Sequence, residues 1–224
     1  NQGIAKALNK GLTLAKKAGA NFVLTMDQDS SFVEGGFQLL TDRLESFSSK
    51  ERSKIGILSC NHLIEGSYLE GGSDELRAVD FVMTSGNLVN MGACNEVGLF
   101  RDEFFIDEVD VEYCRRLKDA GFQVVVVNKA VLRHCLGDTK RHCFLFLRFM
   151  CSHHNYIRRY YITRNRLLMV KLYPDLRWEY FLRNAVSLLK IMMFESDKLR
   201  KISFFYEGIK DGLNNRDGRK EFES

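Results

Sequence analysis

The chain has 224 residues, 45% of them apolar, with a single proline and no low-complexity tract or internal repeat. This length and composition support a packed core and an ordinary globular protein, and they argue against a disordered chain. The net charge of +4 conceals an asymmetry, because residues 1–132 carry 14 Lys and Arg against 19 Asp and Glu, whereas residues 133–224 carry 19 against 10.

Helical and strand patterns alternate along the first part of the chain. Apolar residues at helical spacing predict a helix over 4–15 that ends before Gly19, and a buried strand over 21–26 follows. This alternation predicts an α/β fold with a mostly parallel sheet flanked by helices. The remaining expected elements are a helix at 37–47, strands at 55–60, 79–84, 122–127 and 131–134, a short strand from Asn87, a small helix at 93–97, and a helix that begins among acids and stops at Gly121.

The chain changes character near residue 138. From about residue 144 onward the pattern is helical, and Pro174 separates two helices. We therefore expect an α/β domain over 1–138 and a basic, amphipathic helical extension over 139–224.

The most basic stretch runs from Lys140 to Lys171, with eight Lys and Arg and no acid. Aromatic residues such as Tyr160 and Tyr161 interleave with arginines such as Arg159, a mixture that suits the boundary of an anionic membrane better than nucleic acid. We expect a surface that lies on a membrane, because no apolar run approaches the roughly 20 residues of a spanning helix. Core aromatics beside solvated arginines remain an equal alternative.

The six cysteines show no CxxC pair and no zinc-like spacing to the neighbouring histidines. We expect buried, reduced thiols and a cytoplasmic location, with peripheral contact on the inner face of the cell membrane left open. The cysteines are Cys60, Cys94, Cys114, Cys135, Cys143 and Cys151.

Two carboxylates, Asp27 and Asp29, follow the first predicted strand. An Asp-x-Asp string alone is more often a turn than a site. Open α/β sheets, however, bind ligands where their strands end. Two carboxylates at that place can hold a hard divalent cation and leave room for pyrophosphate oxygens.

A second acidic cluster marks the start of the helix near residue 110. Taken alone it reads as a solvated helix start that complements the helix dipole. The apolar run at 104–106 just before it would instead place the acids at a cleft, where a carboxylate can accept a proton from a hydroxyl. We expect Asp110 to be this base, with Arg115 or Arg116 holding it ionised or contacting phosphate. The cluster comprises Asp107, Glu108, Asp110 and Glu112.

His134 ends the last predicted strand of the first domain. A lone histidine is more often structural than a ligand, but strand ends face the expected cleft. Ligands from three strand ends would form a metal and pyrophosphate site.

The ordered set of these motifs resembles the inverting glycosyltransferases of the GT-A fold and, more narrowly, the bacterial rhamnosyltransferases among them. The resemblance covers nearly the whole chain, and the order is more specific than any one motif. The segments that carry it are Asp27–Ser30, Thr84–Asn87, Phe105–Arg116, His134–Asp138, Arg158–Asn165 and Gly208–Leu213.

The resemblance implies transfer of a sugar, with inversion, from a nucleotide diphosphate to a hydroxyl of a glycan or lipid-linked glycan. It implies that Asp29 and His134 bind Mg²⁺ or Mn²⁺ and that Asp27 supports the metal or the ribose. Asp110 would be the catalytic base. The remaining implied contacts are Arg116 to the pyrophosphate, and Ser85, Gly86 and Asp107 to the sugar or acceptor.

Two departures accompany the resemblance. The chain starts at Asn1 with what looks like the helix that follows the base-binding strands, so we expect a truncated domain that binds donor weakly by itself. Val109 stands where relatives often carry an acid, which keeps Asp107 and Glu108 as alternative bases. Rival interpretations are a metal-dependent nucleotidyltransferase or pyrophosphatase-like enzyme, and a non-catalytic membrane-docking module.

Overall fold

The structure, a computed structural model, describes residues 2–64, 67–68, 75–134, 139–144, 147–152 and 154–222, without the side chains of 67–68, 139–144 and 147–152. The chain forms two compact units. The sheet unit comprises residues 6–101 and 110–135, and the helical unit comprises residues 1–5, 102–109 and 136–224. The domain boundary that the sequence predicts at residue 138 remains a prediction.

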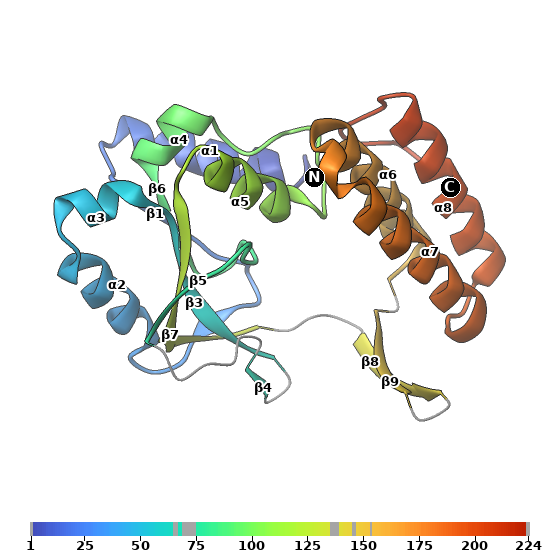
Figure 1. The fold of residues 1–224 in the computed structure, drawn as a ribbon, viewed down its shortest axis with the longest axis horizontal. Helices are drawn as coiled ribbons and strands as arrows, with labels where there is room; N and C mark the ends of the chain where they lie inside the picture. Colours follow the sequence, from blue (N-terminus) through green and yellow to red (C-terminus); the bar gives the residue numbers. More distant parts are fainter. Residues whose placement is uncertain are drawn as a thin grey trace. The chain divides into compact units, whose positions relative to one another are not determined.

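The sheet unit is built on a seven-stranded sheet whose central path runs β1-β6-β3-β7-β2, with β4 paired to β3 and β5 paired to β7 (Figure 1). Its long central strands are apolar runs that are buried along most of their length. The strands are β1 (Phe22–Thr25), β2 (Ser31–Phe32), β3 (Ile55–Ile64), β4 (Ser67–Tyr68), β5 (Leu76–Ala78), β6 (Asn87–Asn90) and β7 (Gln123–Arg133).

The expectation of a mostly parallel sheet was wrong. Among the described strands only β3 and β7 pair in parallel, and the other pairs are antiparallel. The strands β1 and β3 do run in the same direction, as the βαβ pattern indicates, but β6 lies between them and is antiparallel to both. The prediction that β1 and β3 run in the same direction was therefore right. The two strands are not neighbours in the sheet, as a parallel sheet would require.

Helices pack against the sheet from two sides. In Figure 1, α2 and α3 lie on one side of β3 and β7, and α5 lies on the other. Leu40 of α2 is fully buried in a core cluster with Leu58 and Leu132. The helices are α1 (Ile4–Lys17), α2 (Gly36–Ser46), α3 (Ser49–Lys54), α4 (Met91–Val97) and α5 (Val109–Asp119).

Most predicted elements of this part are confirmed, but no strand covers 79–84. The backbone N–H of Val79 still bonds to Val124 of β7, at 3.0 Å. The next residue, Asp80, forms an ion pair with Lys118 of α5. The strand of this segment is β5 at Leu76–Ala78, just before the predicted range.

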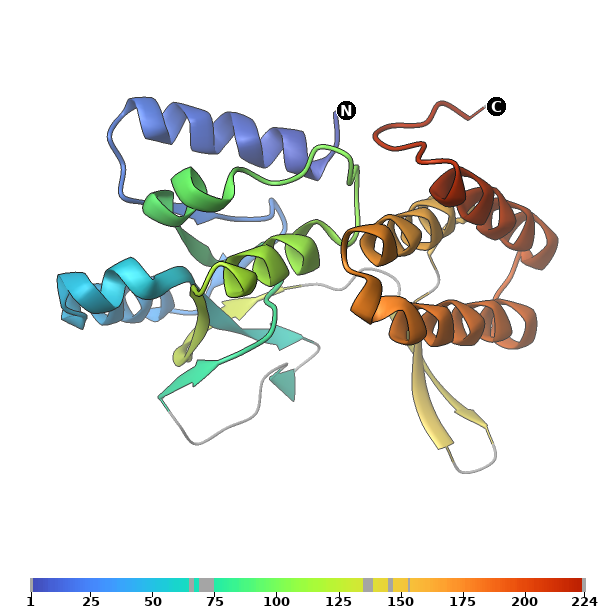
Figure 2. The same ribbon diagram turned by 45° about the horizontal axis from the view of Figure 1, so that its top comes forward.

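The helical unit contains three long helices that lie side by side in both ribbon views (Figures 1 and 2). Gly208 permits close contact between α6 and α8, because a Cβ there would lie 2.6 Å from the carbonyl oxygen of Tyr160. The helices are α6 (Tyr156–Leu172), α7 (Arg177–Phe194) and α8 (Lys198–Leu213), and a 3₁₀ turn, η1 (Pro174–Leu176), separates α6 from α7 as Pro174 predicted.

The expectation of continuous helix from residue 144 was wrong. Strands β8 (Thr139–Phe144) and β9 (Leu147–Ser152) form an antiparallel hairpin before α6 begins. A short run of mixed apolar and basic residues fits both the helical period and the strand period. Pairing between β8 and β9 selects the strand conformation.

The interior of α6 corrects the expected membrane surface over 140–171. Tyr160, Tyr161, Arg159 and Arg164 are all buried. Arg159 pairs with the buried Glu195, at 2.5 Å, and the guanidinium of Arg164 lies 4.9 Å from the centre of the Tyr161 ring. The two tyrosines belong to the core, as the alternative interpretation held. That interpretation was wrong about Arg159 and Arg164, which are buried and not solvated. The side chains of 140–153 lie outside the described ones.

His154 lies beside Arg158, Arg159 and Lys201, and burial together with these cations lowers its pKa to about 4. The unfolded histidine takes up a proton below about pH 6.5, whereas the folded one does not until about pH 4. The contribution of the neutral His154 to stability is therefore fully present at pH 7. The free energy of unfolding falls as the pH drops from about 6.5 to about 4. We expect a loss of about 1–2 kcal/mol between pH 7 and pH 5. Urea unfolding at the two pH values measures it, and a His154→Gln variant should lose less.

Cys60, Cys94 and Cys114 are free and buried, as predicted. The side chains of Cys135, Cys143 and Cys151 lie outside the described ones. Within the described part of the chain, no helix has both the length and the apolar character that crossing a bilayer requires.

Candidate metal and donor site

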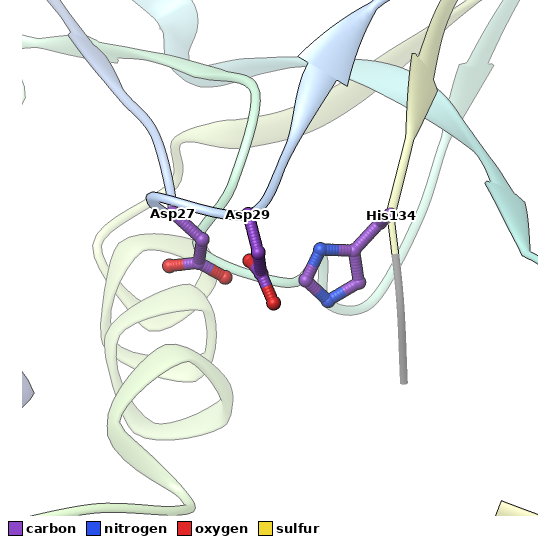
Figure 3. A group of neighbouring side chains, drawn as sticks. All are labelled: Asp27, Asp29 and His134. Carbon is purple, nitrogen blue, oxygen red and sulfur yellow. The ribbon is translucent and has the colours of Figure 1, made fainter. Parts of the chain in front are cut away.

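Three potential metal ligands meet at one edge of the sheet unit: Asp27, Asp29 and His134 (Figure 3). One carboxylate oxygen from each aspartate and one imidazole nitrogen lie within 4.8 Å of one another. Asp29 is exposed and His134 is half-buried. The structure therefore brings the predicted Asp-x-Asp motif and the predicted histidine together.

Strand pairing explains this meeting of residues that are a hundred positions apart. Asp27 follows the end of β1, and His134 follows the end of β7. The short strand β2 pairs Ser31 with Arg133, which places the preceding Asp29 beside the following His134. The local cause is thus the two-residue strand β2, which the sequence patterns did not predict.

Ser30 orients the histidine. Its Oγ lies 2.7 Å from Nδ1 of His134. When Nδ1–H donates to this hydroxyl, the lone pair of Nε2 is available to a cation, an arrangement typical of metal-binding histidines. Ser30 belongs to the quoted motif but had no predicted role, because the signal lies in tertiary contact and not in residue spacing.

The segment Ser85–Gly86 supports the loop that carries Asp27. The backbone N–H of Asp27 donates to Oγ of Ser85, at 3.0 Å, and the N–H of Gly86 donates to the carbonyl of Thr25, at 2.8 Å. Ser85 and Gly86 are both buried. This placement favours a supporting role behind Asp27, and the expected contact with sugar or acceptor stays a prediction.

His62 is a further member of the site that the sequence did not reveal. Its Nε2 lies 2.9 Å from the carbonyl of Ser85, which accepts the bond, and its ring centre lies 6.0 Å from that of His134. Burial lowers the pKa of His62, which favours the neutral ring. The available signal was a polar residue late in an apolar strand, since β3 continues past Cys60 to Ile64.

Gly86 has no room for a side chain. Its φ is 78°, and a Cβ would overlap with Sγ of the buried Cys60. We expect Gly86→Ala to destabilise the chain by about 2–4 kcal/mol, because the clash adds to backbone strain. Gly35→Ala is the matched control, since Gly35 has φ 75° and no atom within 4 Å of the added Cβ. Chemical denaturation should show the smaller loss for the control, and equal losses would contradict the steric argument.

Two of the four acids near residue 110, Asp107 and Glu108, form side-chain bonds within the helical unit. Arg158 binds both carboxylate oxygens of Asp107, at 2.9 and 3.1 Å. The hydroxyl of Tyr180 donates to Glu108, at 2.6 Å, and burial raises the pKa of this carboxyl. Both acids belong to the helical unit. Their contacts favour structural roles, and the expected acceptor contact of Asp107 stays a prediction.

Glu112 and Arg116 form an ion pair inside the sheet unit. Arg116 donates to both oxygens of the fully buried Glu112, at 3.0 and 2.9 Å, and Arg101 donates to the same carboxylate, at 2.9 Å. Arg116 also donates to the carbonyls of Val97 and Leu99. These contacts favour a structural role for Arg116 over the predicted contact with pyrophosphate.

Asp110 differs from the other three acids. It lies in the first turn of α5, in the same unit as the three-residue group, and its side chain is half-buried. Its Oδ1 accepts a bond from the N–H of the next residue, Val111, at 2.9 Å. The positive end of the helix dipole stabilises the ionised form of a carboxylate at this place.

The turn before α5 is held in an unusual conformation. Asp107 and Glu108 have φ values of 64° and 62°, which non-glycine residues rarely adopt. The side-chain amide of Asn165 donates to the carbonyls of Ile106 and Asp107, at 2.7 and 3.0 Å. Strain of this kind persists only where surrounding contacts fix it, and it often accompanies functional sites.

Comparison with known proteins gives one informative match. No family model matches the chain. The chain is similar to the dTDP-rhamnosyl transferase RfbF of Shigella flexneri, with 27% identity over 184 residues. The match covers 76% of this chain, which spans 60% of the length of that relative. The similarity supports the resemblance to glycosyltransferases of the rhamnosyltransferase type.

Proposed function

We propose that the chain is the catalytic part of a glycosyltransferase that moves a sugar from a nucleotide diphosphate to an acceptor hydroxyl. The observation that carries the proposal is the group Asp27, Asp29 and His134 at the edge where β1 and β7 end. Ligand sites of open α/β sheets lie at such edges. The similarity to a dTDP-rhamnosyl transferase supports the same class of reaction.

The residues present fit a divalent cation. Two carboxylates and one imidazole, with ligand atoms within 4.8 Å of one another, form a donor set that suits Mn²⁺ or Mg²⁺. We assign Asp29 and His134 as ligands and Asp27 as a further ligand or ribose contact. When bound, the cation would supply charge compensation for the departing nucleoside diphosphate.

Asp110 is the proposed catalytic base. Its half-buried carboxylate would accept the proton of the acceptor hydroxyl as that oxygen attacks the anomeric carbon. A single displacement of this kind inverts the configuration at that carbon. Asp107 and Glu108 belong to the helical unit, and Glu112 is fully buried. Asp110 is half-buried and lies in the sheet unit, as the three proposed metal ligands do, so it is the best candidate of the cluster.

The finer identity of the substrates is also a proposal. The name of the relative points to dTDP-rhamnose as the donor. We propose a glycan or lipid-linked glycan as the acceptor, in the synthesis of a cell-surface polysaccharide on the cytoplasmic side of the membrane. The proposed partners include no nucleic acid.

Thermal unfolding with nucleoside diphosphates tests the proposal. We expect dTDP to stabilise the chain only when Mn²⁺ or Mg²⁺ is present, by about 2.7 kcal/mol at a ligand concentration of 100 Kd. UDP and GDP serve as comparison ligands. Absence of any metal-dependent shift with all three would refute the transferase assignment for this chain.

Product analysis separates the rival enzyme classes. A transferase incubated with a nucleotide sugar releases the nucleoside diphosphate, whereas a nucleotidyltransferase consumes added pyrophosphate and forms the nucleoside triphosphate and sugar 1-phosphate. A screen of nucleotide sugars, analysed for both products, should give dTDP and free or transferred sugar. Formation of a nucleoside triphosphate and sugar 1-phosphate, only when pyrophosphate is added, would favour the nucleotidyltransferase.

A further inference from the structure

One face of α7 is apolar and exposed. The α7 apolar face is defined by Trp178, Phe181, Leu182, Leu189, Met192 and Met193, whose exposed fractions range from 40% to 71%. A helix turns by about 100° per residue, so these positions form one continuous stripe over four turns. Tyr180 and Ile191, which lie on the opposite side, are buried in the helical unit. Both sides of this helix are therefore apolar, but only one is covered.

Charged residues border this stripe and do not interrupt it. The guanidinium of Arg177 lies 5.3 Å from the centre of the Trp178 ring, at the first turn. Arg183 lies along one border and pairs with Glu179, at 2.6 Å, and Lys190 lies two turns further along that border. An apolar stripe with basic borders and a tryptophan is typical of helices that lie in a membrane interface.

We propose that the α7 apolar face binds the surface of a lipid bilayer that contains anionic lipids. Contiguous exposed apolar patches on proteins mark interaction sites. The helix carries Arg177, Glu179, Arg183 and Lys190 within 18 residues, so it lies parallel to the surface and does not cross it. The inference is independent of the proposed transferase activity.

Charge selects lipid over a second copy of the chain as the occupant. Residues 154–222 carry 15 Lys and Arg against eight Asp and Glu. Two copies joined through this face would bring two positively charged helical units together, whereas an anionic bilayer attracts them. The same excess of positive charge led us to expect a membrane surface over 140–171. The structure buries Tyr160 and Tyr161 of α6 and exposes Trp178 and Phe181 of α7 instead.

Trp178 provides the test, because it is the single tryptophan of the chain and is 71% exposed. On addition of phosphatidylcholine vesicles with phosphatidylglycerol to the 224-residue chain, we expect its emission to shift to shorter wavelength, with quenching by brominated lipids. Neutral vesicles at high salt should bind much more weakly. No shift with anionic vesicles at low salt would overturn the proposal.

Variants locate the surface while retaining the reporter. Phe181→Ser combined with Leu189→Ser should lower vesicle affinity roughly 30-fold, because apolar area is lost. Arg177→Gln should lower it roughly fivefold for anionic vesicles alone. Leu14→Ser in α1, where the side chain is 67% exposed, is the matched control and should bind as the unchanged chain does. An equal loss in the control would overturn the assignment.

Two further measurements keep the outcomes distinct. Circular dichroism should confirm that the serine variant folds, and the pair Met192→Gln and Met193→Gln replaces it if it does not. Light scattering measures the mass in the absence of lipid. A doubled mass that the serine substitutions abolish, together with no response to vesicles, would show that a second copy covers the face and would overturn the lipid proposal.

Discussion

Replacement of Asp29 by asparagine is expected to abolish metal-dependent binding of dTDP and to lower sugar transfer roughly 1,000-fold. The residue is exposed at the strand edge, so the substitution should leave the free energy of unfolding nearly unchanged. Loss of one carboxylate from a group of three potential ligands removes both charge and a donor atom. The electron paramagnetic resonance signal of free Mn²⁺ measures metal binding without any substrate.

Two comparison variants make this test specific. Asp42→Asn replaces an exposed aspartate of α2 that bonds to Gln38, and it should bind Mn²⁺ normally. Ser30→Ala removes the hydroxyl that holds Nδ1 of His134, and it should weaken metal affinity by about 10-fold to 100-fold. Undiminished Mn²⁺ binding by Asp29→Asn would mean that the three residues do not form a metal site.

Asp110→Asn is expected to keep metal-dependent binding of dTDP and to lose transfer by roughly 1,000-fold to 10,000-fold. The amide retains the size and the acceptor oxygen that bonds to the N–H of Val111, but it cannot take up a proton. Binding by calorimetry and transfer by product analysis are therefore measured on the same preparation. Loss of binding together with transfer would indicate a structural role and not a catalytic one.

The neighbouring acids provide the controls for this second test. Asp119→Asn lies at the other end of α5, where Asp119 pairs with Arg115, and it should retain transfer. Asp107→Asn should disturb the bond to Arg158 and lower stability, with transfer retained in the folded fraction. Retained transfer in Asp110→Asn would instead move the base to Asp107 or Glu108.

Sequence patterns predicted the individual helices and strands better than they predicted which strands pair in the sheet. The helix before Gly121, the strand that contains Val124 and the helix break at Pro174 are all encoded by local periodicity and capping residues. The insertion of β6 between β1 and β3 has no local signal, since it depends on which strands pair across the sheet. For this reason the fold class was predictable and the sheet topology was not.

The residues of the candidate site also differ in whether the local sequence or a distant contact reveals them. Asp27, Asp29 and His134 could be proposed because they follow predicted strands, and open α/β sheets bind ligands where their strands end. Ser30 and His62 could not, because their contacts with His134 and Ser85 arise from pairing of strands distant in sequence. The burial of Tyr160 was one of two open alternatives, because interleaved aromatic and basic residues fit both a core and a membrane surface.

The helical unit cannot be obtained by cutting the chain once near residue 136. Residues 102–109 belong to this unit although they precede it by many positions. Their carbonyls at Glu103 and Ile106 accept bonds from the buried Arg164 and Asn165, and Phe104 is 1% exposed. A polypeptide that starts after the cut would leave these side chains without their acceptors in an apolar interior. Expression of α6, α7 and α8 alone should therefore give an insoluble or unfolded product unless this eight-residue segment is supplied as well.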